Sequence, residues 1–370
     1  MSAVLRSGII GTGFIGGVHA RAVRAAGGRL TLVADHTAEA AERARPRLYA
    51  EAAAVSAQQL IDSEDVDVVH ICTPNHLHAE LAEQALSAGK HVVCEKPLAT
   101  TLADAERLVE LAGKAGVTTA VPFVYRYYPT VREARDRIAA GEAGPLWLLH
   151  GSYLQDWLAG PQESNWRLDP TLGGASRAFA DIGVHWCDLM EFTTGHRIVR
   201  LTATLATAFR ERGSDTDSES DSDSATVGTE DGAVVLFQTD RGATGSVVAS
   251  QVSPGRKNRL WFSFDGTAAS YSFDQELPDS LWVGGRRQTA LVSRGPETLT
   301  ASAASYAVLP AGHPQGYQDS FNAFVADTYA AVLGCPPDGA PTFVDGLRAA
   351  RITAAVVESA ASRTWVEVPA

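Results

Sequence analysis

Residues 5–35 read LRSGIIGTGFIGGVHARAVRAAGGRLTLVAD, and this stretch decides the fold of the first part of the chain. An apolar run at residues 5–10 is followed by a glycine-rich turn at 11–16 and by a stretch with the spacing of an amphipathic helix. A second apolar run then ends directly before Asp35. The order strand, glycine-rich turn, helix and strand predicts a right-handed β-α-β unit, which requires a parallel sheet.

The same alternation continues to residue 122. Apolar, β-branched runs are separated by Ala-, Glu- and Arg-rich stretches with helical periodicity, and the predicted helices end on Gly27, Gly89 and Gly116. This pattern is typical of a doubly wound parallel sheet, so we predict an α/β fold with a Rossmann domain over residues 1–122. We expect strands at residues 5–10, 30–34, 66–72, 91–94 and 118–123. We expect helices at residues 17–26, 38–48, 79–88 and 102–115.

The pattern changes at residue 123. Strand-like runs follow one another without long helices between them, which favours a largely antiparallel, open sheet. We therefore predict a second domain of the α+β class over residues 123–370. We expect its strands at residues 146–153, 198–208, 233–239, 244–251, 258–265 and 268–273. We expect its helices at residues 131–140, 180–194, 317–333 and 343–362.

Residues 213–224, which read GSDTDSESDSDS, alternate acidic residues with Ser and Thr and contain no apolar side chain. Two interpretations are open, a calcium-binding loop and a flexible acidic insertion between two strands. The glycine and the glutamate that an EF-hand loop needs at fixed positions are missing. A segment without apolar side chains also cannot offset its ordering entropy, so the flexible insertion is favoured.

Charge and composition argue against several classes of binding partner. The chain has 370 residues, with 31 Lys and Arg against 43 Asp and Glu, and its net charge of −12 argues against nucleic acid or an anionic membrane as a partner. No apolar run is long enough for a transmembrane helix, and we expect no secretory signal. Cys72, Cys94, Cys187 and Cys335 are widely spaced, so neither a disulfide framework nor a zinc motif is expected. We expect a reduced, cytoplasmic protein of enzyme size.

The glycine-rich turn has the features of a dinucleotide site. Gly11 permits the tight turn, Gly13 allows the pyrophosphate to approach the backbone, and Gly16 allows close helix–strand packing. The pyrophosphate would lie at the helix N-terminus, where unpaired N–H groups favour anions. A carboxylate at Asp35 accepts hydrogen bonds from the ribose hydroxyls and repels a 2′-phosphate, which favours NAD. NADP stays open, because arginines at 43 and 45 could reach that phosphate.

The strand predicted over residues 66–72 is followed by polar residues in the sequence C-T-P-N-H-L-H, 72–78. Its histidines, together with His70 and Cys72, could be taken for a metal site. His70 and Cys72 share one face of the strand, however, which is typical of core residues, so we expect no metal. Carboxyl ends of parallel strands bind ligands, and we expect Thr73 and Asn75 to line the nicotinamide side of the cofactor.

Two further motifs carry candidate acid–base residues. The strand at 91–94 is followed by Glu95-Lys96-Pro97, in which a cis Lys-Pro bond would aim the lysine inward to stabilise a developing alkoxide. Asp181 and His185 lie four residues apart in a predicted helix, so the carboxylate can orient the imidazole. Such a pair is also common as a purely structural hydrogen bond.

In this order and spacing, G-x-G-x-x-G, T-P-N-x-x-H, E-K-P and D-I-G-x-H resemble the glucose–fructose oxidoreductase / inositol dehydrogenase / MocA family over nearly the whole chain. The resemblance implies a Rossmann domain followed by an α/β domain whose open sheet serves oligomerisation. It implies nicotinamide-dependent chemistry on sugars, cyclitols and related polyols, with Lys96, Asp181 and His185 as the catalytic set. The implied cofactor-binding residues are Gly11, Thr12, Gly13, Phe14, Ile15, Asp35, Thr73, Pro74, Asn75, His78, Glu95, Lys96, Trp166 and Arg167.

Stretches around residues 123–127, 151–157 and 165–167 are similar to the branch that contains levoglucosan dehydrogenase and similar sugar dehydrogenases. Aromatic faces stack on sugar C–H surfaces, and Gln and Arg bind hydroxyls. Packing roles for the two tryptophans, 157 and 166, are the alternative. The implied substrate-binding residues are Lys96, Tyr125, Arg126, Gln155, Trp157, Arg167, Asp181, His185 and His313, the last in a stretch at 312–317 that would close over the site.

We therefore expect an NAD(P)-dependent oxidoreductase that acts on a secondary alcohol of a sugar, anhydrosugar, glycoside or cyclitol, as a homo-oligomer (dimer or tetramer). Two alternatives come from other classes. One is a glycoside hydrolase with tightly bound NAD that oxidises its substrate transiently. The other is a non-catalytic sensor, against which the full set Lys96, Asp181 and His185 argues, because a sensor needs no acid–base pair.

Overall fold

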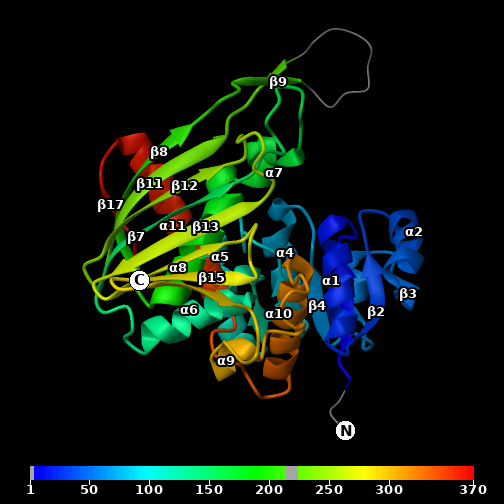
Figure 1. Cartoon of the computed structure of the whole chain (residues 1–370). Helices are drawn as coiled ribbons and strands as arrows, with labels where there is room; N and C mark the ends of the chain where they lie inside the picture. The colour runs from blue at the N-terminus through cyan, green and yellow to red at the C-terminus, as the bar shows by residue number, and fades with distance from the viewer. Residues whose placement is uncertain (1–3, 214–223) are drawn as a thin grey trace. The chain divides into compact units, whose positions relative to one another are not determined.

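The protein is described by a computed structural model that covers residues 4–213 and 224–370. Two compact units are present, one formed by residues up to Tyr127 together with Gly316–Ala350, the other by Tyr128–Gln315 together with Arg351–Ala370 (Figure 1). The predicted acidic insertion at 213–224 falls largely on residues 214–223, which lie outside the described residues. Within the described ranges, no helix combines the length and the apolar character that crossing a membrane requires.

The first unit is built on a six-stranded parallel sheet of the order β3-β2-β1-β4-β5-β6. This order confirms the predicted Rossmann domain, with successive β-α units on either side of β1. The central strands are buried on both faces, which explains their continuous apolar sequences. The strands are β1 (Arg6–Ile10), β2 (Arg29–Ala34), β3 (Ala52–Ala53), β4 (Val68–Ile71), β5 (His91–Cys94) and β6 (Thr119–Ala120).

Local sequence signals set the bounds of the helices in this unit. Thr37, Ser56 and Thr101 each cap a helix by accepting a hydrogen bond from the backbone N–H three residues ahead. Gly116 ends the helix that Thr101 caps, in the left-handed conformation with φ of 65°. Two helices, predicted over 38–48 and 102–115, have the expected bounds. The helices are α1 (Phe14–Ala25), α2 (Ala38–Leu48), α3 (Ala57–Asp62), α4 (His78–Ser87), α5 (Leu102–Ala115) and α10 (Tyr317–Val332).

The second unit contains a nine-stranded sheet in the described part of the chain, of the order β16-β15-β14-β13-β7-β12-β11-β8-β17. The pair β12–β7 is parallel and the other pairs are antiparallel, so the predicted largely antiparallel sheet is confirmed. Its strands are β7 (Leu146–Leu154), β8 (Ile198–Ala206), β11 (Gly232–Thr239), β12 (Thr244–Ser250), β13 (Arg259–Gly266), β14 (Ala269–Asp274), β15 (Ser280–Gly285), β16 (Thr289–Ser293) and β17 (Val366–Glu367). A separate hairpin is formed by β9 (Glu211–Gly213) and β10 (Ser224–Thr226).

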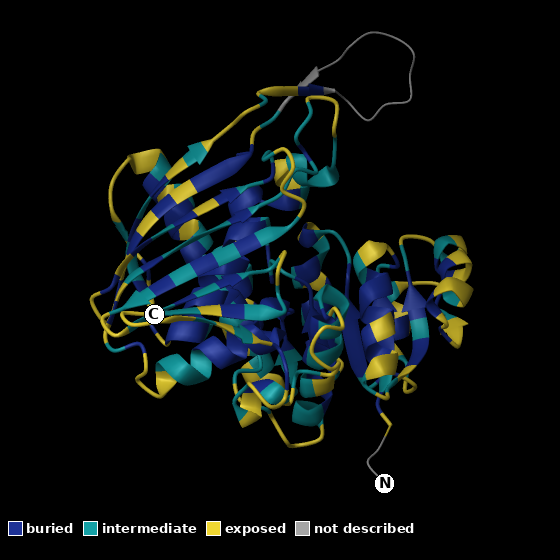
Figure 2. Ribbon diagram, viewed as in Figure 1, coloured by how far each residue is buried: buried dark blue, intermediate teal, exposed yellow. Residues whose placement is uncertain are grey.

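Side chains alternate between a buried and an outer face along these strands. In β11, Val235 and Phe237 are buried while Val234 and Leu236 are exposed. Figure 2 shows this alternation as dark blue and yellow bands across the sheet. The helices of this unit are α6 (Pro129–Ala139), α7 (Pro170–Gly173), α8 (Val184–Thr194), α9 (Ala301–Ala304) and the C-terminal part of α11 (Phe343–Ser362).

Helix α8 packs on the buried face of the sheet through a close approach at Gly151. The indole N–H of Trp186 donates to the carbonyl of Trp261 over 2.9 Å, and a Cβ at residue 151 would lie 2.3 Å from that indole nitrogen and 2.2 Å from that carbonyl oxygen. Trp186 is 1% exposed, so it has little room to move. This approach fixes the helix that carries His185 against the sheet.

We predict that Gly151→Ala lowers the free energy of unfolding by about 1–3 kcal/mol, because the added methyl overpacks this contact. Chemical unfolding followed by circular dichroism measures the change. Gly113→Ala in α5 is the matched control: no heavy atom lies within 4 Å of its Cβ position, so this variant should be as stable as the wild type or slightly more stable. Equal stability of Gly151→Ala and wild type would contradict the proposed contact.

Candidate functional site

The glycine-rich turn between β1 and α1 fits a dinucleotide pyrophosphate. Gly11 has φ of +93°, and a Cβ there would lie 2.5 Å from the carbonyl oxygen of Cys72. A Cβ at Gly16 would lie 2.1 Å from the carbonyl oxygen of Gly11. The space around Gly13 is open within 4 Å, and α1 has no side-chain cap. The first and third glycines are therefore needed for packing, while the second leaves room for a ligand at the helix N-terminus.

Asp35 follows β2 and is held as a carboxylate. It accepts hydrogen bonds from the backbone N–H and the hydroxyl of Thr12, and from the backbone N–H and Nδ1 of His36. Burial alone would raise its pKa, but the hydrogen bonds from Thr12 and His36 lower the pKa of Asp35 to about 2. The group is thus ionised at neutral pH, as recognition of ribose hydroxyls requires. Arg45 pairs with Glu42 over 2.7 Å, which gives this arginine a partner other than a 2′-phosphate.

His78 connects the loops that follow β4 and β5. Its Nδ1 lies 2.8 Å from the carbonyl oxygen of Pro97 and its Nε2 lies 2.9 Å from the carbonyl oxygen of Thr73. Burial lowers the pKa of His78, although the two carbonyls oppose this shift. The hydroxyl of Thr73 is buried and has no hydrogen-bond partner within the described residues, so it is available to a ligand such as a nicotinamide group. Asn75, in the same loop, is buried.

Glu95 and Lys96 are placed by a buried histidine. Glu95 Oε1 lies 3.0 Å from Nε2 of His19, and its Oε2 accepts a hydrogen bond from the backbone N–H of Lys96 over 3.1 Å. The peptide bond between Lys96 and Pro97 is cis. His70 lies in the same buried chain, with its Nδ1 3.0 Å from Nδ1 of His19, which supports the interpretation of His70 as a core residue. The sequence motifs did not single out His19.

Arg126 and Tyr125 lie in a short 3₁₀ turn (Val124–Tyr127) of the first unit, and both side chains are buried. Arg126 forms an ion pair with Asp345 over 2.7 Å and donates to the carbonyl oxygen of Gly339 over 3.1 Å. Burial raises the pKa of Asp345, but Arg126 reverses this effect and the net shift is downward. Arg126 therefore stabilises the first unit, and its role at a substrate stays a prediction.

In the second unit, Asp181 lies in the turn before α8 and His185 lies in the first turn of α8. The helix expected over 180–194 begins with one turn of π-helix, Phe179–Gly183, before it becomes α-helical. Such turns are frequent at functional sites. Asp181 Oδ2 accepts a hydrogen bond from Nε2 of Gln251 over 2.7 Å, and its Oδ1 lies 3.8 Å from Nε of Arg167. His185 is 7% exposed, with its ring 6.2 Å from the ring of Tyr153.

The predicted sugar-binding side chains Gln155 and Trp157 form a polar chain beyond the end of β7. The indole N–H of Trp157 donates to Gln155 Oε1 over 2.9 Å. Gln155 Nε2 and the hydroxyl of Tyr153 both donate to Oδ1 of Asn258 over 2.7 Å. Tyr153 and Asn258 are thus two site candidates that the sequence motifs missed. Only their position beside Gln155, more than a hundred residues away in one case, reveals them.

Trp166 and Arg167 lie together in a 3₁₀ turn (Trp166–Leu168). The guanidinium of Arg167 stacks 4.3 Å above the Trp166 ring and donates to Asn165 Oδ1 over 3.3 Å. Arg167 is therefore pre-positioned near Asp181. His313 is exposed, and its carbonyl oxygen accepts a hydrogen bond from Arg294, so a contact of its imidazole with a substrate stays a prediction.

Two groups of predicted site residues emerge, one within each unit. The carboxyl edge of the parallel sheet gathers the glycine-rich turn, Asp35, the loop 73–78 and Glu95 with Lys96. The second unit gathers Arg167 and Gln251 around Asp181, with Tyr153 beside His185, and it links Gln155 with Trp157. The first group has the features of a dinucleotide site and the second has those of an acid–base site for a polyol.

Comparison with known proteins places both units in one family. A sequence model described as "Oxidoreductase family, NAD-binding Rossmann fold" matches residues 5–123, and one described as "GFO/IDH/MocA C-terminal domain" matches residues 131–272.

Among curated relatives, levoglucosan dehydrogenase of Pseudarthrobacter phenanthrenivorans is 33% identical over 391 aligned residues, covering 99% of this chain and 98% of the relative. Inositol 2-dehydrogenase of Salmonella typhimurium is 37% identical over 153 residues, covering 40% of this chain and 46% of the relative. A solved structure of levoglucosan dehydrogenase in complex with NADH and levoglucosan superposes with a TM-score of 0.92 at 32% identity, covering 99% of this chain and all of that one. The chain therefore belongs to the glucose–fructose oxidoreductase / inositol dehydrogenase / MocA family of NAD-binding oxidoreductases.

Proposed function

We propose that the protein is an NAD-dependent dehydrogenase that moves a hydride between nicotinamide and a secondary alcohol or ketone of a sugar-like substrate. The observation that carries the proposal is that one chain of this family contains both a parallel-sheet edge with the features of a dinucleotide site and, in the second unit, Asp181 held by Gln251 near Arg167, with His185 four residues further on. The relatives reported above are dehydrogenases, which favours this function over a hydrolase with bound NAD.

The proposed mechanism assigns one task to each side chain. In the oxidative direction, His185 accepts the proton of the substrate hydroxyl, and Asp181 orients the imidazole ring. Lys96 donates to the same oxygen and stabilises the negative charge that develops on it. The bound nicotinamide supplies the hydride acceptor. Glu95 and His19 hold the backbone of Lys96 in place through the hydrogen bonds described above.

An anhydrosugar or pyranoside is the proposed substrate class. Similarity to levoglucosan dehydrogenase extends over 99% of the chain at 33% identity, whereas the match to the inositol 2-dehydrogenase of Salmonella typhimurium covers 40% of it and a scyllo-inositol 2-dehydrogenase of Bacillus subtilis is 26% identical over 69% of it. The second unit, in which the sugar side chains lie, is thus included in the first match. Trp157 offers an aromatic face to the C–H surface of a ring, while Gln155 and Arg167 can bind its hydroxyls.

We further propose that the protein acts as a homo-oligomer whose subunits pair through the outer face of the nine-stranded sheet. Val234, Leu236 and Val248 are 47%, 50% and 39% exposed on adjacent strands of this face, and Trp282 and Leu291 continue it on β15 and β16. Apolar side chains at such positions are typical of an interface.

The cytoplasm is the proposed location. Cys72 directly follows β4, and Cys94 is the last residue of the neighbouring strand β5. The two are not in a disulfide, and burial raises the pKa of both thiols well above its ordinary range. Reduced thiols agree with a cytoplasmic protein that draws on the soluble NAD pool.

Lys96→Met and His185→Ala should each lower kcat by at least about 100-fold, because each removes a group that exchanges charge or a proton with the reacting oxygen. The assay follows nicotinamide reduction with levoglucosan, D-glucose, a methyl glucoside and myo-inositol. The affinity for NADH, measured by fluorescence titration, should change little. Lys114→Met, at an exposed position in α5, is the control and should behave as the wild type. Unchanged turnover in either site variant would exclude its assigned role.

Asp35→Asn should weaken NAD binding by about 10-fold and leave NADP binding unchanged or improved, because the variant keeps a hydrogen-bonding group but loses the negative charge. Since the pKa of Asp35 is about 2, the wild-type affinity for NAD should be constant between pH 8 and pH 5 with respect to this group. Isothermal titration calorimetry with each dinucleotide measures both effects. A wild-type preference for NADP would contradict the assignment of Asp35.

A double variant, Leu236→Glu with Val248→Glu, should shift the protein to a smaller assembly in analytical ultracentrifugation, because two charges on the outer face oppose its burial. Leu277→Glu with Val308→Glu is the control, with side chains of 70% and 62% exposure outside the sheet face. A wild-type protein that sediments as a monomer would contradict the proposed interface.

A further inference from the structure

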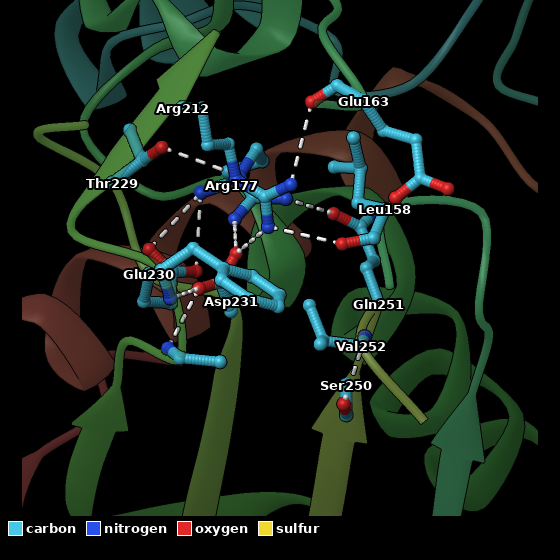
Figure 3. Close-up of polar contacts among 12 residues, drawn as sticks. Leu158, Glu163, Arg177, Arg212, Thr229, Glu230, Asp231, Ser250, Gln251 and Val252 are labelled. Atoms are coloured by element: carbon cyan, nitrogen blue, oxygen red, sulfur yellow. Dashed lines mark hydrogen bonds and ion pairs between the residues drawn. The ribbon is translucent and has the colours of Figure 1, made fainter. Parts of the chain in front are cut away.

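We infer that Gln251 is a positioning residue for Asp181, and that a buried chain of polar and charged groups from Gln251 to Arg212 fixes the position of the loop 158–163 relative to Asp181. The inference rests on the proposed function, because it takes Asp181 as the residue that orients His185. All the groups involved lie within the second unit, and Figure 3 shows most of them.

Gln251 follows β12 and is fully buried, at 0% exposure. Its Nε2 donates to Asp181 Oδ2 over 2.7 Å, and its Oε1 accepts from Arg177 Nη1 over 2.9 Å. A carboxylate can only accept and a guanidinium can only donate, so the amide has a single orientation that satisfies both neighbours. Gln251 therefore fixes the carboxylate of Asp181 relative to the guanidinium of Arg177.

Arg177 is fixed at its other end by Asp231. Both side chains are buried and form an ion pair, and Arg177 Nε also donates to the hydroxyl of Thr229 over 3.2 Å. Asp231 Oδ2 accepts from the backbone N–H groups of Ala208 and Phe209. A buried pair with this many hydrogen bonds has little freedom, so it acts as a rigid support for the amide of Gln251.

Arg212 extends the chain to a surface loop. Its Nη2 donates to Asp231 over 2.9 Å and to the carbonyl oxygen of Leu158 over 3.0 Å (Figure 3). Its Nη1 donates to the carbonyl oxygen of Gly160 over 2.7 Å. The backbone N–H of Leu158 also donates to the carbonyl oxygen of Gln251 over 3.2 Å. The loop 158–163 thus has its backbone attached to the same chain that holds Asp181.

The loop 158–163 lies between candidate site residues in the sequence. It directly follows Gln155 and Trp157, and it precedes Trp166 and Arg167, which are the residues proposed to contact the sugar or the cofactor. The Gln251 end of this hydrogen-bonded chain therefore acts on the proposed acid–base pair, and the Arg212 end acts on the segment proposed to bind the sugar. The two ends should consequently affect different kinetic constants.

Gln251→Glu tests the first end, because it has the same shape and keeps an acceptor for Arg177 but replaces the donor to Asp181 with an oxygen. We expect kcat to fall roughly 10- to 100-fold, as loss of one hydrogen bond to a charged group produces, with KM for the sugar and Kd for NADH within about threefold of wild type. Gln275→Glu is the matched control, since it adds the same charge at a half-buried position of this unit, where the amide lies near the hydroxyl of Tyr128. It should retain wild-type kinetics.

Arg212→Met tests the second end, because Met has an unbranched apolar side chain but lacks the guanidinium, which lies 4.8 Å from the Phe209 ring and makes the hydrogen bonds to the loop. We expect KM for the sugar to rise about 10-fold, with kcat within about threefold. If Gln251→Glu does not fold, Arg177→Lys replaces it. Lysine can pair with Asp231 but cannot hold Gln251 at the same time, so kcat should again fall while KM is kept.

The assay uses the sugar of the panel with the highest wild-type turnover, and thermal unfolding verifies that each variant is folded. Wild-type kcat in a folded Gln251→Glu, or in a folded Arg177→Lys if it takes its place, overturns the inference, as does an Arg212→Met variant with unchanged KM. Asp181→Asn is measured alongside to separate two failures. If Asp181→Asn is inactive and Gln251→Glu is fully active, only this inference fails. If Asp181→Asn is fully active, or if no sugar is oxidised, the proposed function fails and this inference with it.

Discussion

A parallel sheet ends all of its strands at one edge, and the arrangement of the first unit depends on this constraint. Its order, β3-β2-β1-β4-β5-β6, places the segments after β1, β2, β4 and β5 side by side. Motifs that are separated by tens of residues in the sequence therefore line one surface. His78, with one ring nitrogen at each of two loops, and Glu95, held by His19, then fix the details of that surface. The fold supplies the proximity and these buried polar contacts supply the geometry.

In the second unit, the site residues are positioned by buried charged groups and not by the edge of a parallel sheet. Asp231 receives two buried arginines and two backbone N–H groups, so its charge is compensated although water is excluded. Burial raises its pKa, but the N–H of Phe209 and the charge of Arg177 produce a net lowering. Buried ion pairs of this kind contribute little net stability compared with well-packed apolar residues. Their presence between Asp181 and the loop 158–163 is better explained by the need for a defined position than by a need for stability.

Much of the first unit could be predicted because its signals are local. The helices at 38–48 and 102–115 begin at capping threonines, 37 and 101, and so had the expected bounds. The two-residue strand β3 and the short helix α3 were not predicted, because neither is long enough to show a period. The strand expected over 118–123 is limited to β6, Thr119–Ala120. Beyond it, the backbone N–H of Val121 donates to the carbonyl of Pro341, a partner that periodicity cannot identify.

At the site, too, residues in local motifs could be predicted, whereas residues whose partners are distant in the sequence could not. Glycine spacing and the carboxylate after β2 indicate a dinucleotide from the residues alone, whereas the catalytic roles proposed for Lys96, Asp181 and His185 depended on resemblance to a family. Gln251 was not predicted because its partner Asp181 lies 70 positions away in the sequence and no motif surrounds it. The π-helical turn that carries Asp181 was likewise expected to be ordinary helix, because side-chain periodicity does not distinguish one wider turn. The assignment of helix α10 to the first unit also depends on distant partners, such as the contact between Tyr329 and Ser7.

The proposed function requires direct transfer of hydrogen from a sugar carbon to nicotinamide. Incubating the protein with NAD and a panel sugar that carries deuterium on its carbinol carbons tests it, with the mass of the dinucleotide product as the measurement. We expect reduced dinucleotide that carries one deuterium and accumulates together with the keto sugar. Cleavage of a glycoside with deuterium retained in the sugar and no net reduction of NAD would contradict it.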